Sequence, residues 1–219
     1  MLRRDQSSIL EKRMADVLPR IAELKKQQRY QEAIDEINET VRTNLGLAPR
    51  FVKGVTDQDL LGMVRSGLIT TERTVALAKL LKERADINWA VGQPRNGLIR
   101  TVKSLMLYLE VFDKKQDSIF ADYYSDVEAL AANLGEYELP AATRETLFRF
   151  YEATGRYSKA EDLLFEALET PDKGTWVEAG RQFYQRLAAK SDTELEAGNL
   201  PRAELEESRA ELASYESQA

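Results

Sequence analysis

The chain has 219 residues, of which 43% are hydrophobic and 31% charged, and its formal net charge is −6. This balance is typical of a globular protein with much exposed helix, and 11 Gly and 6 Pro are too few for an all-β fold with many turns. Cys and His are both absent, which excludes disulfides, thiol nucleophiles and thiolate metal sites and removes the commonest general base near neutral pH.

Charge is divided unevenly along the chain. Residues 1–110 contain 19 Lys and Arg against 14 Asp and Glu, a net charge of +5. Residues 111–219 contain 12 against 23, a net charge of −11. These opposite charges could attract the two halves to each other, within or between molecules. Solvated helix faces are the simpler explanation of the same pattern.

Nothing in the sequence predicts a signal peptide or a membrane span. The first residues, MLRRDQSSILEKRM, are charged throughout and lack the apolar region of a signal peptide. No apolar run approaches the roughly 18–20 residues that a spanning helix needs. We therefore expect a cytoplasmic protein.

The chain opens with two predicted helices. Apolar residues recur at helical spacing over 3–29, but Pro19 lies inside this pattern and is expected to kink the helix or divide it at Leu18. A second helix follows directly and closes at Gly46. The next segment, 47–56, is predicted to be a connector.

Two more helices follow with recognisable starts. Thr56 and Asp59 form a capping pair that opens a short helix. A longer helix starts at Thr70 or Thr71 and ends at the Gly-Gln-Pro break of 92–94, after which another apolar stripe begins. Each of these segments shows the 3.6-residue period, and no segment shows strand alternation.

The polar segment 113–118 (DKKQDS) marks the reversal of charge and is the predicted boundary inside the chain. It separates an N-terminal helical-hairpin subdomain, 1–112, from a C-terminal one, 117–219. One continuous array is the alternative. A helix at 119–134 then carries an aromatic patch, predicted to pack internally, whose members are Phe120, Tyr123 and Tyr124.

The segment 141–171 is the most regular helical hairpin of the chain. Apolar residues follow the i, i+3, i+4 spacing on both sides of Gly155, which can end the first helix in a left-handed conformation. Ser158 and Glu161 have the spacing of a capping box, and Pro171 ends the second helix. At about 34 residues, this hairpin is of the tetratricopeptide kind.

Two helices complete the chain, one at 175–196 and one at 201–214, and the last has a mostly polar face typical of the end of a stack. The hairpin turns are not spaced by a constant 34 residues; they start at Gln28, Gly92, Gly155 and Gly198. The predicted fold is therefore all-α, an irregular tetratricopeptide-like helical-hairpin repeat array of about ten helices.

Three segments in this order carry a family resemblance over nearly the full length: RYQEAIDEI (29–37), TGRYSKAEDLLFEALE (154–169) and FYQRLAAKSDTELEAGNLPRAELEE (183–207). The chain resembles an uncharacterised family of tetratricopeptide-like, all-helical proteins from Gram-positive bacteria. The resemblance supports the fold and implies no activity, since that family has none assigned. The chain departs from the tetratricopeptide pattern at Phe148, where a small residue is usual, and at Glu207, where an apolar one is.

No motif predicts chemistry. A Gly-rich phosphate loop and a Ca²⁺ loop of the EF-hand type are both missing. The acidic residues have the spacing of solvated helix faces. We therefore expect a protein that is not an enzyme and that has no catalytic residue, metal site or cofactor.

Protein binding is the leading functional hypothesis, as a non-catalytic adaptor with a protein or peptide partner. The resemblance implies that the first helix of each hairpin lines a groove, where basic side chains could hold a peptide's acidic groups or terminal carboxylate. For Trp89 a place in the core is the favoured interpretation, since large aromatic residues at helical spacing usually pack there. The residues predicted on this surface are Lys79, Lys82, Trp89, Glu145, Arg149 and Glu152.

Three rival hypotheses remain. The first is a homo-oligomeric structural protein joined through its oppositely charged halves. The second is nucleic-acid binding by the basic first helix together with Arg95, Arg100 and Lys103, which the sequence pI of about 5.1 disfavours. The third is an enzyme that works without His or Cys.

Overall fold

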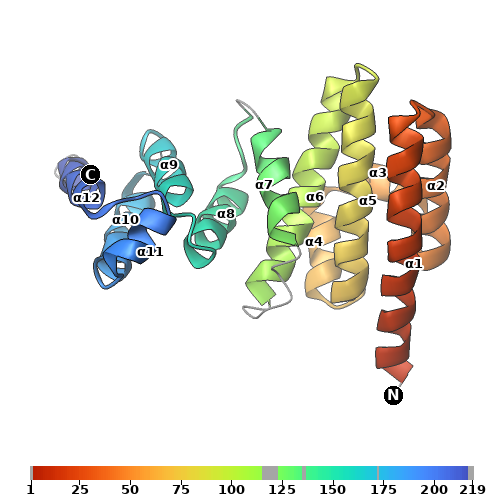
Figure 1. Cartoon of the computed structure of the whole chain (residues 1–219), viewed down its shortest axis with the longest axis horizontal. Coiled ribbons are helices and arrows are strands. Elements are labelled where there is room, and N and C mark those ends of the chain that lie inside the picture. Colours follow the sequence, from red (N-terminus) through yellow and green to blue (C-terminus); the bar gives the residue numbers. More distant parts are fainter. Residues whose placement is uncertain (1, 115–122, 135–136, 172, 217–219) are drawn as a thin grey trace. The chain divides into compact units, whose positions relative to one another are not determined.

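The computed structural model describes residues 2–114, 123–134, 137–171 and 173–216. Within these residues the chain forms twelve α-helices and no strand, which confirms the predicted all-α class (Figure 1). The helices are α1 (Leu2–Lys26), α2 (Tyr30–Asn44), α3 (Pro49–Gly54), α4 (Asp57–Arg65), α5 (Thr71–Ala90), α6 (Pro94–Lys114), α7 (Tyr124–Ala132), α8 (Ala141–Ala153), α9 (Tyr157–Leu168), α10 (Lys173–Ala188), α11 (Asp192–Ala197) and α12 (Arg202–Glu216).

The chain divides into two compact units, residues 1–138 with α1 to α7 and residues 139–219 with α8 to α12. In the first unit α1, α2, α5 and α6 lie side by side, and the contacts of α5 with α1, α2 and α6 agree with this view (Figure 1). The boundary predicted at 113–118 falls largely on residues 115–122, which lie outside the described residues, as does Phe120.

Pro19 does not divide the first helix, which is one of the two outcomes expected from the sequence, the other being a kink. Helix α1 is continuous from Leu2 to Lys26. A proline removes the hydrogen bond to the carbonyl four residues back, here that of Ala15. Because Ala15 and Pro19 are both exposed, water can bind that carbonyl.

Two short helices account for the difference between the ten predicted helices and the twelve observed. The predicted connector contains α3, where Pro49 occupies the first turn, in which a proline costs no hydrogen bond. The helix predicted over 175–196 is broken, and α11 starts after Ser191. There Ser191 and Glu194 form a reciprocal capping box that sequence inspection missed.

Capping was predicted correctly in the first unit and wrongly at one site in the second. The side chains of Thr56 and Thr70 cap α4 and α5. Ser158, however, does not cap α9: its N–H donates to the carbonyl oxygen of Gly198 at 3.1 Å. Glu161 instead turns into the core, where it accepts a hydrogen bond from the hydroxyl of Tyr184.

Four hairpin turns share one hydrogen-bond pattern. At Gly155, for example, the N–H donates to Glu152 O at 3.1 Å, and the next N–H, of Arg156, donates to Tyr151 O at 2.8 Å. This is a Schellman-type helix end. The last turn has Asn199 in the left-handed position, one residue later than predicted. In these four turns the residues with left-handed backbone conformation are Gln28 (φ 58°), Gly92 (71°), Gly155 (70°) and Asn199 (57°).

The second unit is built around aromatic side chains. Phe148 of α8 is buried, and its ring centroid lies 5.6 Å from that of Trp176 and 5.3 Å from that of Phe183, both on α10. Phe148 thus fills a space between helices that a small residue would leave open. The polar helix α12 docks on α10 through two buried leucines, Leu205 and Leu212.

Candidate functional site

Two of the three predicted binding residues of α5, Lys79 and Lys82, contact residues at the start of α7. The ammonium group of Lys79 lies 4.7 Å from the ring centroid of Tyr123, within the range of a cation–π contact. Lys82 Nζ lies 3.2 Å from Asp126 Oδ1. Both lysines therefore hold α7 against α5 within the first unit.

Trp89 lies at the end of α5 next to the start of α6. Its side chain is neither fully in the core nor free, since the residue is 37% exposed. A Cβ atom built on Gly97 would lie 2.8 Å from the indole ring, so the ring sits directly on the backbone of α6. Trp89 Nε1 also donates to Thr101 Oγ1 at 3.5 Å.

The other three predicted residues are on α8, in the second unit. Glu145 and Arg149 are exposed. Arg149 Nη2 donates to Thr146 Oγ1 at 3.4 Å. Glu152 is paired with Arg186 of α10, at 2.5 Å from Oε1 to Nε and 2.8 Å from Oε2 to Nη2.

A different cluster of cations surrounds a cavity of about 290 Å³ between α2, α3, α5 and α6, which we call the basic pocket. Its cationic side chains come from three helices and are not accompanied by any carboxylate among the residues that line the cavity. Apolar side chains of all four helices, together with Asn38 and Asn96, form the rest of its wall. The five cations are Arg50, Lys53, Arg84, Arg100 and Lys103.

Helical spacing explains how these side chains reach one cavity. On α6, the lining residues Asn96, Ile99, Arg100 and Lys103 follow the i, i+3, i+4, i+7 pattern of a single face. On α3, Arg50 and Lys53 are three residues apart, and both are exposed. They form the rim of the pocket, while Arg84 and Arg100 are less exposed.

The cations of the basic pocket differ in their bonding. Lys103 has partners within the protein: its Nζ donates to the carbonyl oxygen of Val55 at 2.5 Å and lies 3.5 Å from Asp57 Oδ1. Arg84 Nη1 is buried and has no hydrogen-bond partner within the described part of the chain. Asn88, one turn further along α5, has an Oδ1 atom in the same situation.

Desolvation acts on both inner arginines. The pKa of Arg84 is lowered, first by burial and then by the positive charge of Arg100, and only Asp35 acts against this. Burial likewise lowers the pKa of Arg100. The pocket therefore contains too little negative charge to compensate its buried cations.

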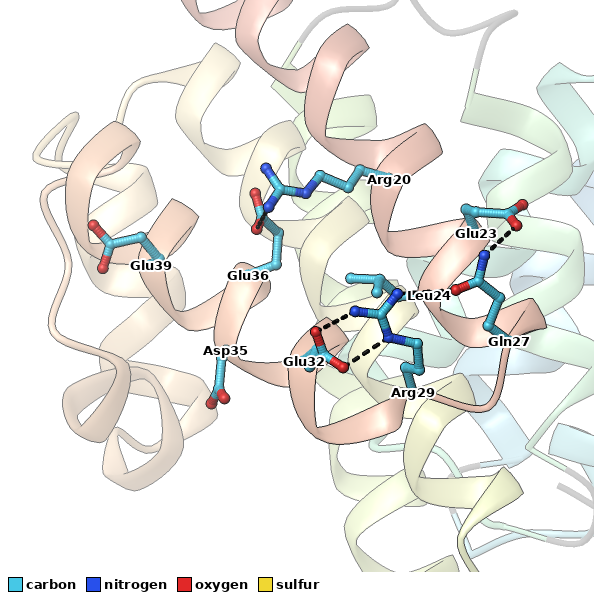
Figure 2. Close-up of a pocket in the computed structure, with 9 residues that line it drawn as sticks. All are labelled: Arg20, Glu23, Leu24, Gln27, Arg29, Glu32, Asp35, Glu36 and Glu39. Atoms are coloured by element: carbon cyan, nitrogen blue, oxygen red, sulfur yellow. Dashed lines mark hydrogen bonds and ion pairs between the residues drawn. The ribbon is translucent and has the colours of Figure 1, made fainter.

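A larger hollow lies between α1 and α2, which we call the acidic groove (Figure 2). It measures about 780 Å³, and among the described residues five carboxylates and two arginines line it, each arginine being paired with one carboxylate. Arg29 makes two hydrogen bonds to Glu32, of 2.7 and 2.6 Å, and Arg20 Nη2 lies 3.3 Å from Glu36 Oε2 (Figure 2). Such pairs contribute little, and none of the described residues of this groove has a buried side-chain nitrogen or oxygen without a hydrogen-bond partner. The basic pocket is the better candidate site.

The basic pocket was not found from the sequence. The sequence places Arg100 and Lys103 in its basic half, and no motif connects them with Arg50, Lys53 and Arg84. These residues are up to 53 positions apart along the chain. The one local signal was the i, i+3 spacing of basic residues in a segment predicted to be a connector.

The described residues show neither a metal-binding cluster nor a membrane-spanning helix. They contain no group of three or more His, Cys, Asp and Glu placed to hold a metal ion. None of the helices they form has the length and apolar character of a bilayer-crossing segment.

Comparison with known proteins places the chain in a family. No curated protein and no solved structure matches it significantly. A family model does match, and its description is a family of unknown function (DUF6483). The match runs over residues 1–216, which is nearly the entire chain. The protein therefore belongs to the DUF6483 family of unknown function.

Proposed function

We propose that the protein is a non-catalytic adaptor, of the tetratricopeptide-like type, that binds an acidic segment of a partner protein in the basic pocket of its first unit. The observation that carries this proposal is the lining of the pocket, with five cationic side chains and no carboxylate. Lys103 is paired with Asp57, whereas the other four cations have no carboxylate partner among the described residues. Positive charges of this kind beside a cavity are suited to acidic groups.

The rim and the wall of the pocket have different roles in this proposal. Arg50 and Lys53 are exposed, so they attract an acidic segment over several ångströms and raise its rate of association. The wall also offers apolar surface from Ile37, Val41 and Ile99. A short peptide can place a carboxylate and an adjoining apolar side chain in a cavity of about 290 Å³.

The helical hairpins support the adaptor proposal. Consecutive helices pack in pairs, as in α1 with α2, α5 with α6 and α8 with α9. The four turns with the same hydrogen-bond pattern suggest that the hairpins are variants of one unit. Proteins assembled from such units commonly act as binding surfaces.

The test is affinity capture of the tagged full chain from its native lysate, with nuclease present, followed by mass spectrometry. The double substitution Arg50→Glu and Lys53→Glu reverses the charge of the rim without touching a buried residue. We expect a partner that the original chain retains and that this variant loses. The matched control is Arg73→Glu with Arg95→Glu, which changes the net charge equally at two exposed positions outside the pocket.

Two results would count against the proposal. One is the return of the tagged chain alone. The other is equal loss of the partner in the rim variant and in the control, since binding would then depend on total charge and not on the pocket. Thermal denaturation of each variant checks that the protein remains folded.

Self-association is a second candidate, favoured by the exposed acidic face of α12. On that helix Glu204, Glu207 and Glu211 are exposed, and a second copy could place them in the basic pocket. Light scattering at low and high salt distinguishes the two proposals. Oligomers that dissociate with salt and are lost in the rim variant support self-association, whereas a monomer at all salt concentrations contradicts it.

A further inference from the structure

Arg84 is the group in the basic pocket that most lacks an anion. Its Nη1 is buried and has no hydrogen-bond partner within the described residues. Buried donors in folded proteins are nearly always bonded, and an unpaired charged donor is more unfavourable than a neutral one. An anionic oxygen in the pocket would supply the missing acceptor.

Arg100 adds a second positive charge from α6. Its guanidinium group donates from Nη1 to the carbonyl oxygen of Asn96 at 3.0 Å, so it has one local partner but no paired carboxylate within the described part of the chain. The two guanidinium groups are close enough to act on each other electrostatically. Each is also partly desolvated, which strengthens their attraction for one shared anion.

The number of charges decides which anion fits best. A carboxylate carries one negative charge, whereas a phosphate monoester carries about 1.5 to 2 near neutral pH and offers three acceptor oxygens. One phosphate monoester can therefore neutralise two guanidinium groups. The planar fork of arginine also matches phosphate oxygens in a bidentate manner.

The cavity has room for the group that carries the phosphate. Its volume is about 290 Å³, and Ile37 and Val41 of α2 and Ile99 of α6 line it together with the cations. An inorganic ion would leave these apolar side chains in contact with water. A phosphate attached to a carbon group would cover them.

We propose that the basic pocket recognises a phosphate monoester, with Arg84 and Arg100 binding the phosphate oxygens and the apolar side chains of α2 and α6 contacting the carbon group. This inference rests on the proposed function, because it names the chemical group through which the acidic segment is recognised. A phosphorylated side chain and a free organic phosphate share this chemistry. Carboxylates of the acidic groove, on the same helix α2, disfavour an extended polyanion.

Calorimetric titration with phenyl phosphate tests the phosphate assignment on the full chain in phosphate-free buffer. Phenyl sulfate is the comparison ligand, since it has a similar shape and one negative charge. We expect phenyl phosphate to bind roughly tenfold more tightly than phenyl sulfate. Arg84→Gln and Arg100→Gln should each weaken phenyl phosphate binding by a factor of about ten or more.

Exposed arginines on the same two helices provide matched controls. Arg73→Gln on α5 and Arg95→Gln on α6 remove the same charge outside the pocket and should leave the affinity unchanged. No measurable binding would overturn the assignment. So would equal affinity for phosphate and sulfate, or binding that neither pocket substitution weakens.

Phosphatase treatment of the lysate before affinity capture identifies the source of the phosphate. Loss of the partner after treatment shows that the phosphate is on a protein. A partner retained equally after treatment overturns this inference and leaves the acidic-segment proposal standing. If phenyl phosphate binds as expected but no partner is captured in either lysate, the adaptor proposal fails and a free organic phosphate is the ligand.

Discussion

The hydroxyl of Tyr184 on α10 donates a hydrogen bond of 2.6 Å to Glu161 Oε1 on α9, and both side chains are buried. Among the described residues, no cation acts on Glu161: the pKa of its carboxyl is raised, first by burial and then further by the nearby charges of Glu204 and Asp162. Hydrogen bonds from Tyr184 and Ser208 oppose this change without reversing it. The second unit therefore contains a carboxyl group that binds its proton more tightly when folded than when unfolded.

Glu161→Gln should change how the free energy of unfolding depends on pH. Between the ordinary pKa of 4.5 and the raised pKa of the folded state, the folded protein holds more protons than the unfolded one. The stability that the protonated Glu161 contributes to the folded state is therefore lost as pH rises through this window. Relative to the variant, the original chain should therefore be less stable at pH 7 than at pH 4. Urea denaturation at several pH values measures this difference, and Glu166→Gln at an exposed site of α9 is the control. A difference that does not vary with pH would contradict the assignment.

Arg84→Met should stabilise the first unit when no anion is bound. The substitution removes a buried, unpartnered guanidinium nitrogen and keeps the aliphatic stem, so we expect a gain of about 1 kcal/mol in the free energy of unfolding. The exposed Arg73→Met on the same helix should change stability by less than about 0.5 kcal/mol. Denaturation in phosphate-free buffer measures both effects. A loss of stability at Arg84 would mean that its guanidinium group has a structural role.

Lys25 links α1 to α5 by two ion pairs, with Nζ 2.6 Å from Glu83 Oε2 and 2.7 Å from Asp86 Oδ2. Lys25→Met should cost about 1–3 kcal/mol, since it leaves two partly buried carboxylates without their cation. The neighbouring, exposed Lys26→Met should have little effect. Adding Glu83→Gln and Asp86→Asn to Lys25→Met should recover most of the loss. Failure of this recovery would show that packing of the lysine stem, and not charge, holds the helices together.

The backbone at Gly198 lies so close to the start of α9 that there is no room for a side chain at this position. A Cβ atom at this position would lie 2.2 Å from Cδ2 of the buried Tyr157 ring and 2.9 Å from the carbonyl oxygen of Gly155. Gly198→Ala should therefore destabilise the second unit by about 2–4 kcal/mol. Gly174→Ala on α10 meets no atom within 4 Å and should be neutral or slightly stabilising. Thermal denaturation compares the two, and similar melting temperatures would contradict the crowding argument.

Sequence periodicity was sufficient for most of the helices, because apolar spacing and turn residues are local signals. It failed where contacts between helices override the structure that the local sequence pattern predicts. Glu161 has the spacing of a capping residue, yet it bonds to Tyr184, which lies 23 positions later. Pro19 has the form of a helix breaker, yet helix α1 continues through it at a position where both Ala15 and Pro19 are exposed. Neither outcome can be deduced from one segment alone.

The candidate site could not be predicted for a related reason. Its cations are on three helices, and none of them forms a motif with its neighbours in the sequence. The residues that were predicted for binding include Lys82 and Glu152, whose charges are matched by Asp126 and Arg186. Whether a charge is matched depends on helix packing, which composition and spacing do not reveal.

The pairing of consecutive helices also has a kinetic consequence. Because α1 packs on α2, α5 on α6 and α8 on α9, much of the packing forms between residues close in sequence. Chains with such local contacts fold quickly, on the order of microseconds to milliseconds for small helical domains. Each turn that closes a pair is short, so little chain entropy is lost before the first apolar contacts form. We therefore expect each unit to recover its packed helix pairs rapidly after thermal unfolding.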